Sequence, residues 1–275
     1  MKTLEYPMLA TTITEKEWDF IMRPIRDAGL PKVQVSSKYP KTLMYGPKEF
    51  QGLGIMHPFL HQELMHVAAC IHEGERETIT GELIRAGLEQ MQLETGLPGY
   101  LFSQDYSILE TLTTDCWLKT VWQFAWHNEM SIKDTVVKPK LYRDNDSFIM
   151  EEVIRHGFRA ADLKKINECR MFLQVANLSE ITTVDGKNIT LNAWKGIKDI
   201  NKLNDYQWPR SPPSLSPIHW RLWRKALTVS FIDPMKLRSR DLVIPLHDWL
   251  IDATTHWRWF YSTQDDTLYK KEGLL

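Results

Sequence analysis

The sequence predicts a mainly α-helical protein of several helices with two short β-hairpins. Through most of the first two thirds of the chain, apolar residues recur with the three- and four-residue spacing of an amphipathic helix. Asp185-Gly186, a dipeptide preferred in tight hairpin turns, places one hairpin near 181–190. Two aromatic runs around a polar turn place the other near 257–270. With 275 residues, 43% of them hydrophobic, the chain has ample apolar material for a packed core.

Several of the predicted helices have recognisable ends. Thr14 and Glu17 have capping-box spacing at the start of the first helix, and Gly29 and Pro31 are its expected stop signals. Pro217 occupies the first position of the last helix, where its fixed φ is favourable. The stretch 32–55 contains prolines and glycines without a helical period, so it is expected to be extended and loop-like. The predicted helices cover 14–29, 60–74, 79–96, 114–125, 148–156, 161–173 and 216–227.

A polar segment divides the chain into two predicted helical regions. The apolar periodicity stops at about 131–147, so we expect one region over 1–135 and a second over 141–275. A proline-rich segment at about 203–216 is a second predicted linker, within the C-terminal region.

Charge is nearly balanced overall but unevenly distributed. The net charge of −1 gives no field over the whole chain that would attract nucleic acid or an anionic membrane. Residues 61–115 carry ten acids against two bases, a net charge of −8, whereas 206–240 carry seven bases against one acid, a net charge of +6. Any electrostatic binding must therefore come from a local patch.

Composition also restricts the cellular setting. No apolar run approaches the roughly 18–20 residues of a membrane helix, and Glu5 and Pro7 do not fit a secretory signal. Cys70, Cys116 and Cys169 are an odd number without metal-binding spacing, and each is interpreted as a buried thiol. We expect no membrane partner and an intracellular protein of the nucleus or cytoplasm.

An ordered series of motifs resembles a known family. It begins with Leu30-Pro31, Tyr39-Pro40, Met44-Tyr45-Gly46-Pro47 and Gly52-Leu53-Gly54-Ile55, and continues through Lys138-Pro139-Lys140-Leu141, Trp208-Pro209-Arg210 and Leu222-Trp223-Arg224-Lys225 to Trp257-Arg258-Trp259-Phe260-Tyr261. The series is similar to the region after the polymerase palm in reverse transcriptases of retrotransposons, especially the long mobile-element reading frames of microbial eukaryotes. It covers roughly residues 10–270. The resemblance implies that 1–135 is a thumb-like helical region and that 141–275 is a C-terminal helical region with a tryptophan-rich basic segment.

The chain departs from this family because it lacks a palm. RNA-directed DNA polymerases need palm aspartates to hold two metal ions. Asp265-Asp266 is the one Asp-Asp pair, but it lacks an aromatic residue two positions before it and is interpreted as a solvated turn. The resemblance therefore implies a detached C-terminal fragment of a reverse transcriptase, inactive alone, with RNA, DNA or a separate palm-containing polypeptide as its partner.

The candidate nucleic-acid-binding residues are basic and aromatic. Trp220 and Trp223 share one predicted helix with three bases, and cations beside aromatic faces are typical of sequence-nonspecific strand binding. The same tryptophans would equally form a core stripe with Leu227, and this alternative stays open. Lys32, Lys38, Lys41 and Lys48 form a second, looser basic loop, and the resemblance implies that it lies beside the thumb, where a polymerase holds the duplex. The candidates are Arg221, Arg224, Lys225, Trp220, Trp223, Lys38, Lys41 and Lys48.

Other site types have little support in the sequence. Four histidines, His57, His61, His66 and His72, crowd one segment, but they match no zinc-binding arrangement and are interpreted as incidental. Glu89 and Glu94 are weak candidates for an acid and base pair, and no nucleophile or phosphate-loop motif occurs. We therefore expect no catalytic residues, no metal and no cofactor. A helical protein-interaction module is the main alternative function, ahead of an independent enzyme.

Overall fold

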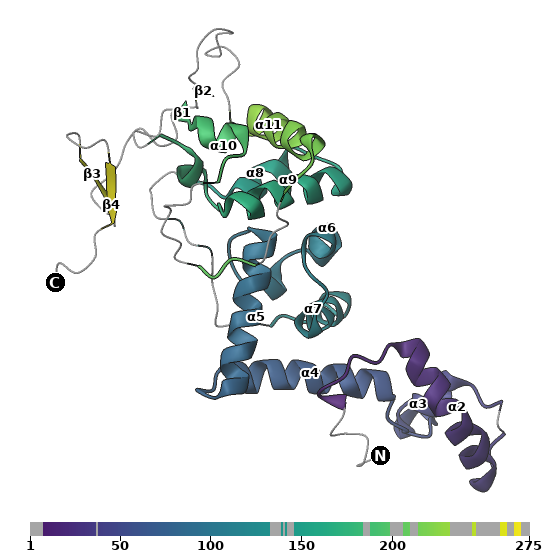
Figure 1. Cartoon of the computed structure of the whole chain (residues 1–275). Coiled ribbons are helices and arrows are strands. Elements are labelled where there is room, and N and C mark those ends of the chain that lie inside the picture. Colours follow the sequence, from purple (N-terminus) through teal and green to yellow (C-terminus); the bar gives the residue numbers. More distant parts are fainter. Residues whose placement is uncertain are drawn as a thin grey trace. The chain divides into compact units, whose positions relative to one another are not determined.

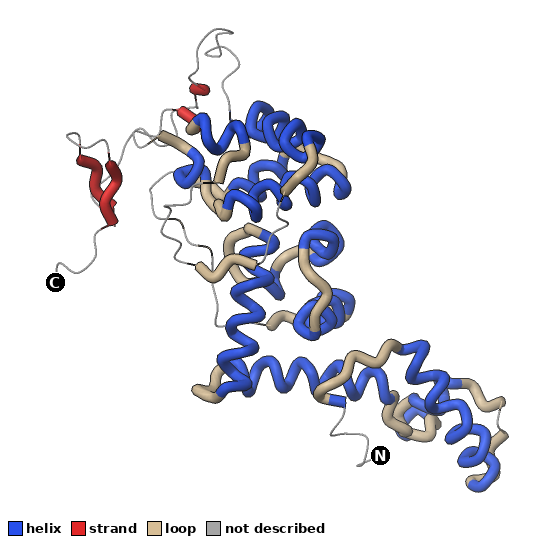
Figure 2. The backbone as a smooth tube through the Cα atoms, in the orientation of Figure 1, coloured by secondary structure: helices blue, strands red, loops and turns tan. Residues whose placement is uncertain are grey.

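The computed structural model confirms the mainly α-helical class (Figure 2). Helices and their connecting loops make up nearly all of the chain that is described, and the few strands are two to four residues long. The structure describes residues 8–36, 38–132, 139, 141, 146–183, 188–198, 206–209, 214–231, 244–245, 259–262 and 267–270.

The chain forms two compact units. The first comprises 1–84 and 115–132, and the second comprises 85–114 and 133–275. The boundary between 132 and 133 falls inside the predicted linker at 131–147, whereas residues 85–114 belong with the C-terminal unit and not with the region that precedes them in sequence.

The first unit is built from helices whose sequence signals are mostly visible. It contains α2 (Glu15–Lys32), α3 (Lys41–Tyr45), η1 (Lys48–Phe50), α4 (Pro58–Gly74), the first turns of α5 (Ile79–Thr95) and α7 (Trp117–His127). The capping box of Thr14 and Glu17 is present, as predicted. The helix continues past Gly29, because Leu30 is buried, and it ends at Lys32, directly after the second predicted stop signal, Pro31.

Two local expectations in this unit are corrected. The stretch 32–55 is not wholly extended, because α3 and η1 form around the buried Met44. Its glycines let the chain fold back on itself: Gly54 N–H donates to Gly46 O at 2.9 Å, and a Cβ on Gly52 would lie 2.1 Å from that oxygen. Cys116 is the N-cap residue of α7 and is exposed, so the interpretation of this cysteine as a buried thiol is wrong.

The second unit consists of short helices followed by a packed group. Helix α9 (Ala160–Leu173) packs against α11 (Pro217–Phe231) and α8 (Ile149–Arg155), as Figure 1 shows. The remaining helical elements are η2 (Leu101–Ser103), α6 (Tyr106–Leu109), η3 (Glu110–Leu112), η4 (Leu178–Ile181) and α10 (Leu191–Lys195).

Short strands occur where the hairpins are predicted. β3 (Trp259–Ser262) pairs antiparallel with β4 (Thr267–Lys270), in agreement with the predicted C-terminal hairpin. Near 181–190, Thr182 and Ile189 form an antiparallel bridge, and β1 (Asn188–Ile189) pairs in addition with β2 (Ile244–Pro245). The Asp185-Gly186 turn and Asp265-Asp266 lie outside the described residues.

A buried arginine joins three segments of the second unit. Arg170 of α9 is 0% exposed, and its guanidinium donates to the carbonyls of Leu93 and Glu94 at the end of α5 and to Val175 O at 3.2 Å. Asn167, one turn earlier, receives the Arg170 Nε–H at 2.8 Å and donates to Glu94 O at 2.7 Å. These carbonyls have no partner within α5, so the two side chains cap its C-terminus.

Gly96 leaves room for this cap. It follows α5 with a φ of +66°, and a Cβ there would lie 2.6 Å from Arg170 Cζ. A left-handed glycine just after a helix is common, and here the absence of a side chain also admits the guanidinium. Burial lowers the pKa of Arg170 to about 9, so the group is still charged at pH 7.

Arg170→Met is expected to destabilise the second unit by about 3 to 5 kcal/mol, because it leaves buried carbonyls without donors. Urea unfolding followed by circular dichroism measures the change. Arg155→Met is the matched control: Arg155 is an exposed base of α8 paired with Glu152 at 2.8 Å, and its loss is expected to cost no more than about 1 kcal/mol. Equal losses in the two variants would show that Arg170 has no special role.

Candidate nucleic-acid interface

Helix α11 has one buried face that fixes its orientation. The residues that it buries recur at helical spacing, and they are Trp223, Ala226, Leu227, Ser230 and Phe231. Trp223 is 0% exposed, and its indole N–H donates to the carbonyl of Ala193 in α10 at 2.9 Å. This hydrogen bond satisfies the polar atom of the ring inside the core, so the ring is held in one position.

The opposite face of α11 is basic. Arg221, Arg224 and Lys225 follow one another at i, i+3 and i+4, which places them on one side of the helix, away from Trp223. Arg221 and Lys225 are exposed and Arg224 is half-buried. Within the described part of the chain, none of the three forms an ion pair, and Lys225 Nζ lies 5.7 Å from the ring centre of Phe158. We call these three residues the basic face.

The two tryptophans of α11 have different surroundings. Trp220 is half-buried, with its ring edge-to-face against Phe172 at 5.6 Å, and its ring would contact any Cβ added at Gly196. Trp223 belongs to the core, which corrects its candidacy as a stacking platform: its ring faces are covered by the unit itself. Only part of the Trp220 ring remains accessible to a base.

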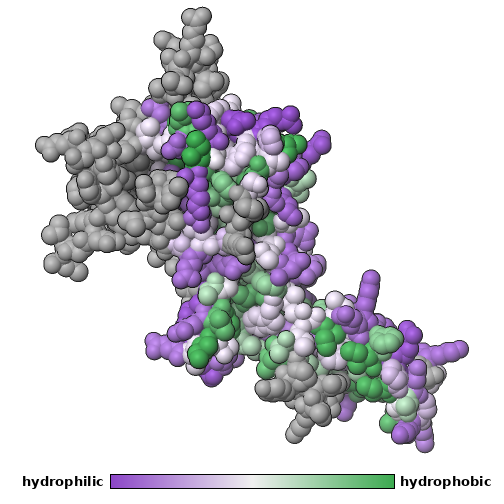
Figure 3. Space-filling view, in the orientation of Figure 1, coloured by the Kyte–Doolittle hydropathy of each residue, from purple (hydrophilic) through white to green (hydrophobic). Residues whose placement is uncertain are grey.

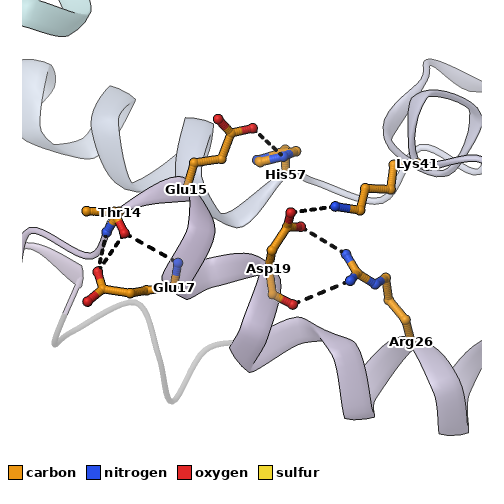
Figure 4. Close-up of polar contacts among 7 residues, drawn as sticks. All are labelled: Thr14, Glu15, Glu17, Asp19, Arg26, Lys41 and His57. Atoms are coloured by element: carbon orange, nitrogen blue, oxygen red, sulfur yellow. Dashed lines mark hydrogen bonds and ion pairs between the residues drawn. The ribbon is translucent and has the colours of Figure 1, made fainter.

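The basic loop belongs to the first unit and is partly neutralised. Lys41 forms an ion pair with Asp19, which also receives Arg26 Nη1 at 3.1 Å (Figure 4). The hydrogen bond from Lys41 is the main cause that lowers the pKa of the Asp19 carboxyl. Lys38 and Lys48 are exposed, and the Lys48 stem lies against Gly54. The ion pair of Lys41 with Asp19 thus helps to hold α3 to α2.

The histidine segment does not assemble a metal site in the described residues. His57 is the N-cap residue of α4, and its ring centre lies 4.3 Å from that of Tyr45. His57 Nε2 lies 3.9 Å from Glu15 Oε1 (Figure 4). His66 is fully buried, with Nε2 2.7 Å from Met8 O, and burial lowers its pKa. Over the described ranges, no three His, Cys, Asp or Glu side chains are placed to hold an ion.

Glu94 has a structural role instead of a catalytic one. Its carboxylate is buried and receives Thr114 N–H and Thr114 Oγ1–H, both at 2.8 Å. These bonds tie the end of α5 to the loop before α7 and leave no geometry for an acid and base pair with Glu89.

A buried carboxylate in the first unit was missed. Glu63 of α4 is 3% exposed and lines a cleft of about 430 Å³. Its position four residues after Phe59 and four before Val67 places it on the apolar side of α4, and that periodicity was the available signal. A charged residue in the middle of an apolar stripe indicates either a buried ion pair or a site.

Comparisons of the chain with protein families, curated proteins and solved structures give no match. None of the helices in the described ranges is both long and apolar enough to cross a lipid bilayer.

Trp223→Ala is expected to lower the stability of the second unit by about 3 to 5 kcal/mol, because it removes a large buried ring and leaves Ala193 O unpaired. Trp220→Ala is expected to cost less, since part of that ring is already in contact with water. Thermal and urea unfolding of the two variants provide the comparison. A larger loss in Trp220→Ala would mean that the two rings have been assigned to the wrong environments.

Proposed function

We propose that this chain is a nucleic-acid-binding protein of the reverse-transcriptase-like type, equivalent to the thumb and post-thumb region of a retrotransposon enzyme without its palm. It binds RNA or DNA weakly and without sequence preference, in the nucleus or cytoplasm. The observation that carries the proposal is the basic face of α11, where Arg221 and Lys225 are exposed, Arg224 is half-buried and no described carboxylate forms an ion pair with them, while the opposite face anchors the helix in the core. The family named in this proposal rests on the ordered motifs of the sequence.

The charge pattern supports a phosphate partner. Three cations on one side of a helix, without carboxylates paired to them in the described residues, match a short stretch of phosphates. A rigid helix presents them without further ordering, which lowers the entropy lost on binding. The half-buried Trp220 adjoins this face and offers limited stacking, so we expect electrostatics to dominate. Binding of this kind does not distinguish one base from another.

A palm-containing polypeptide is the proposed protein partner. The family resemblance implies that polymerase chemistry needs aspartates that this chain does not supply. The proposal therefore assigns to the chain a holding role toward template or primer, and assigns the metal-dependent step to a separate chain.

A second candidate, a protein-interaction module, is favoured by the surface of α4. Leu60, Leu64 and Ile71 recur at i, i+4 and i+11 and are 45%, 51% and 39% exposed, opposite the face that carries His66. In Figure 3 apolar residues of the first unit lie at the surface among hydrophilic ones. An exposed apolar stripe on a helix is typical of a protein contact. Loss of a captured protein partner in a Leu60→Ser, Leu64→Ser variant, with nucleic-acid binding intact, would favour this candidate.

Replacement of Arg221, Arg224 and Lys225 by alanine is expected to weaken binding of single-stranded RNA and DNA and to flatten its salt dependence. Three phosphate contacts on a single strand give a slope of log K against log salt of about −2, and removal of all three cations abolishes most of it. Fluorescence anisotropy at several salt concentrations measures both quantities. Circular dichroism verifies the fold, since the three side chains lie away from the core.

The matched control replaces Lys16, Arg23 and Arg76 by alanine. These are exposed bases of the other unit, so the net charge changes equally. This variant is expected to bind like the parent. Unchanged affinity and slope in the Arg221, Arg224, Lys225 variant, or equal losses in both variants, would exclude a specific role for the basic face.

The purified chain is expected to show no primer extension with Mg²⁺ or Mn²⁺, because the sequence lacks a palm with partnering carboxylates. Incubation with a primed RNA template and nucleotides, followed by gel separation, tests this. Template-dependent extension that is lost in Asp265→Ala would contradict the proposal and make Asp265-Asp266 a catalytic pair.

A further inference from the structure

The cleft in the first unit has the size of a small-molecule site. Its volume of about 430 Å³ lies within the range of roughly 300–1,000 Å³ that is usual for ligand pockets. The segment before α2, helix α4 and helix α7 all contribute to its lining. Exposed residues such as Thr14, Gln123 and His127 form the rim, whereas Glu63 and Phe124 are buried and form the floor.

The rim is held in place by local hydrogen bonds. Thr14 is fixed by its capping box with Glu17, with Oγ1 and the backbone N–H both 2.8 Å from Glu17 Oε2 (Figure 4). On the other side, His127 Nδ1 lies 2.8 Å from Gln123 O within α7. The cleft is thus bordered by well-defined helix ends, which favours a preformed site.

Glu63 is the unusual residue of the cleft. Its Oε1 receives a long hydrogen bond of 3.3 Å from Gln62 Nε2, while Oε2 is buried and has no hydrogen-bond partner. Gln62 is held by other contacts, since its Oε1 accepts from Trp18 Nε1 at 3.0 Å and its Nε2 donates to Ile13 O at 3.0 Å. It cannot turn to serve the second carboxylate oxygen.

The described residues around Glu63 supply no positive charge. His66 Nδ1 is 4.0 Å from Glu63 Oε1, but the deep burial of His66 favours its neutral form. The other titratable residues of the cleft are Glu15, an acid, and His127 at the rim. Burial also raises the pKa of Glu63, as expected for a carboxylate without a cation. A buried acid of this kind is costly unless something in the cleft compensates it.

We propose that this cleft binds a small organic ammonium ion, with the positive nitrogen on Glu63 Oε2 and an apolar body against Phe59 and Phe124. An ammonium group carries both the charge and the hydrogen-bond donors that Oε2 lacks. The rings of Phe59 and Phe124 meet edge-to-face at 6.5 Å, and together with Ile13 and Leu60 they line the cleft with apolar surface. Aromatic faces beside an acid are typical of amine sites. The site is independent of the basic face, which lies in the other unit.

The test is titration of the full chain with n-butylammonium, cyclohexylammonium and phenethylammonium, followed by calorimetry and ligand-observed NMR. At least one amine is expected to bind saturably, and the alcohol with the same skeleton is expected to bind at least about tenfold more weakly, because it lacks the charge. Glu63→Gln, which keeps the shape of the side chain, is expected to weaken amine binding by roughly tenfold or more and to leave alcohol binding unchanged.

Two further variants keep the result interpretable. Gln123→Trp narrows the rim of the cleft without altering Glu63, and it is expected to weaken the binding of amines and of alcohols to the same extent. Glu49→Gln removes an exposed carboxylate of the same unit outside the cleft and is expected to bind amines like the parent. Absence of saturable binding by all three amines, or equal binding by the parent and by a folded Glu63→Gln chain, would overturn the proposal.

The pH dependence of stability gives an independent readout. The pKa of Glu63 is raised in the folded chain, so the Glu63 carboxyl loses its proton at a lower pH in the unfolded chain than in the folded chain. The free energy of unfolding therefore falls as the pH rises from the ordinary pKa of the carboxyl, near 4.5, toward its raised pKa in the folded chain. Glu63→Gln is therefore expected to raise the melting temperature at pH 7 and to leave it nearly unchanged at pH 4. At pH 7, addition of the amine is expected to raise the melting temperature of the parent but not that of the Glu63→Gln variant. A lower melting temperature of Glu63→Gln at pH 7 would show that the carboxylate is already compensated and would contradict the proposal.

Discussion

The second unit depends on a buried cation, Arg170, which forms no ion pair with a carboxylate among the described residues. Its charge is stabilised by peptide carbonyls, chiefly those of Leu93 and Glu94, at the negative end of the α5 dipole. The guanidinium can satisfy several carbonyls at once because its donors point in fixed directions within one plane. Three segments that are distant in sequence are thereby held at one point: the end of α5, helix α9 and the turn at Val175.

Helix α11 is positioned by the helix that carries Arg170. Its buried face contacts α9, and Trp223 reaches α10, so the direction in which Arg221 and Lys225 point is set by core packing and not by the charges themselves. This separation is physically useful. Because core packing holds the helix, replacement of its exposed cations costs the protein little stability. Such substitutions can therefore change nucleic-acid binding without changing the fold. The basic face is thus a surface property of an otherwise conventional core helix.

The sequence predicted the helices well because their signals are local. Capping at Thr14, proline at the first position of α11 and apolar spacing on α7 all act within a few residues. It did not predict which unit 85–114 joins, since this depends on Glu94 binding Thr114 and on Arg170 reaching Leu93, contacts across tens of residues. The sequence also left open whether Trp223 is a core residue or a surface ring that stacks on bases, because the helical spacing is the same in both cases. Only the tertiary structure distinguishes the two.

Each unit contains a buried ionisable side chain, Arg170 in the second and Glu63 in the first. The two differ in whether neighbouring groups of the chain compensate the charge, and this difference bears on function. Arg170 is surrounded by oriented acceptors, so its charge is compensated within the chain and its role is structural. Glu63 has one weak donor and an open cleft beside it, so its charge is not compensated by the described chain. An unpaired buried acid reduces stability, and such a cost persists in natural proteins mainly where a ligand offsets it. The same electrostatic rule therefore identifies one group as an anchor of the fold and the other as a site: what separates them is whether the chain itself supplies the partner.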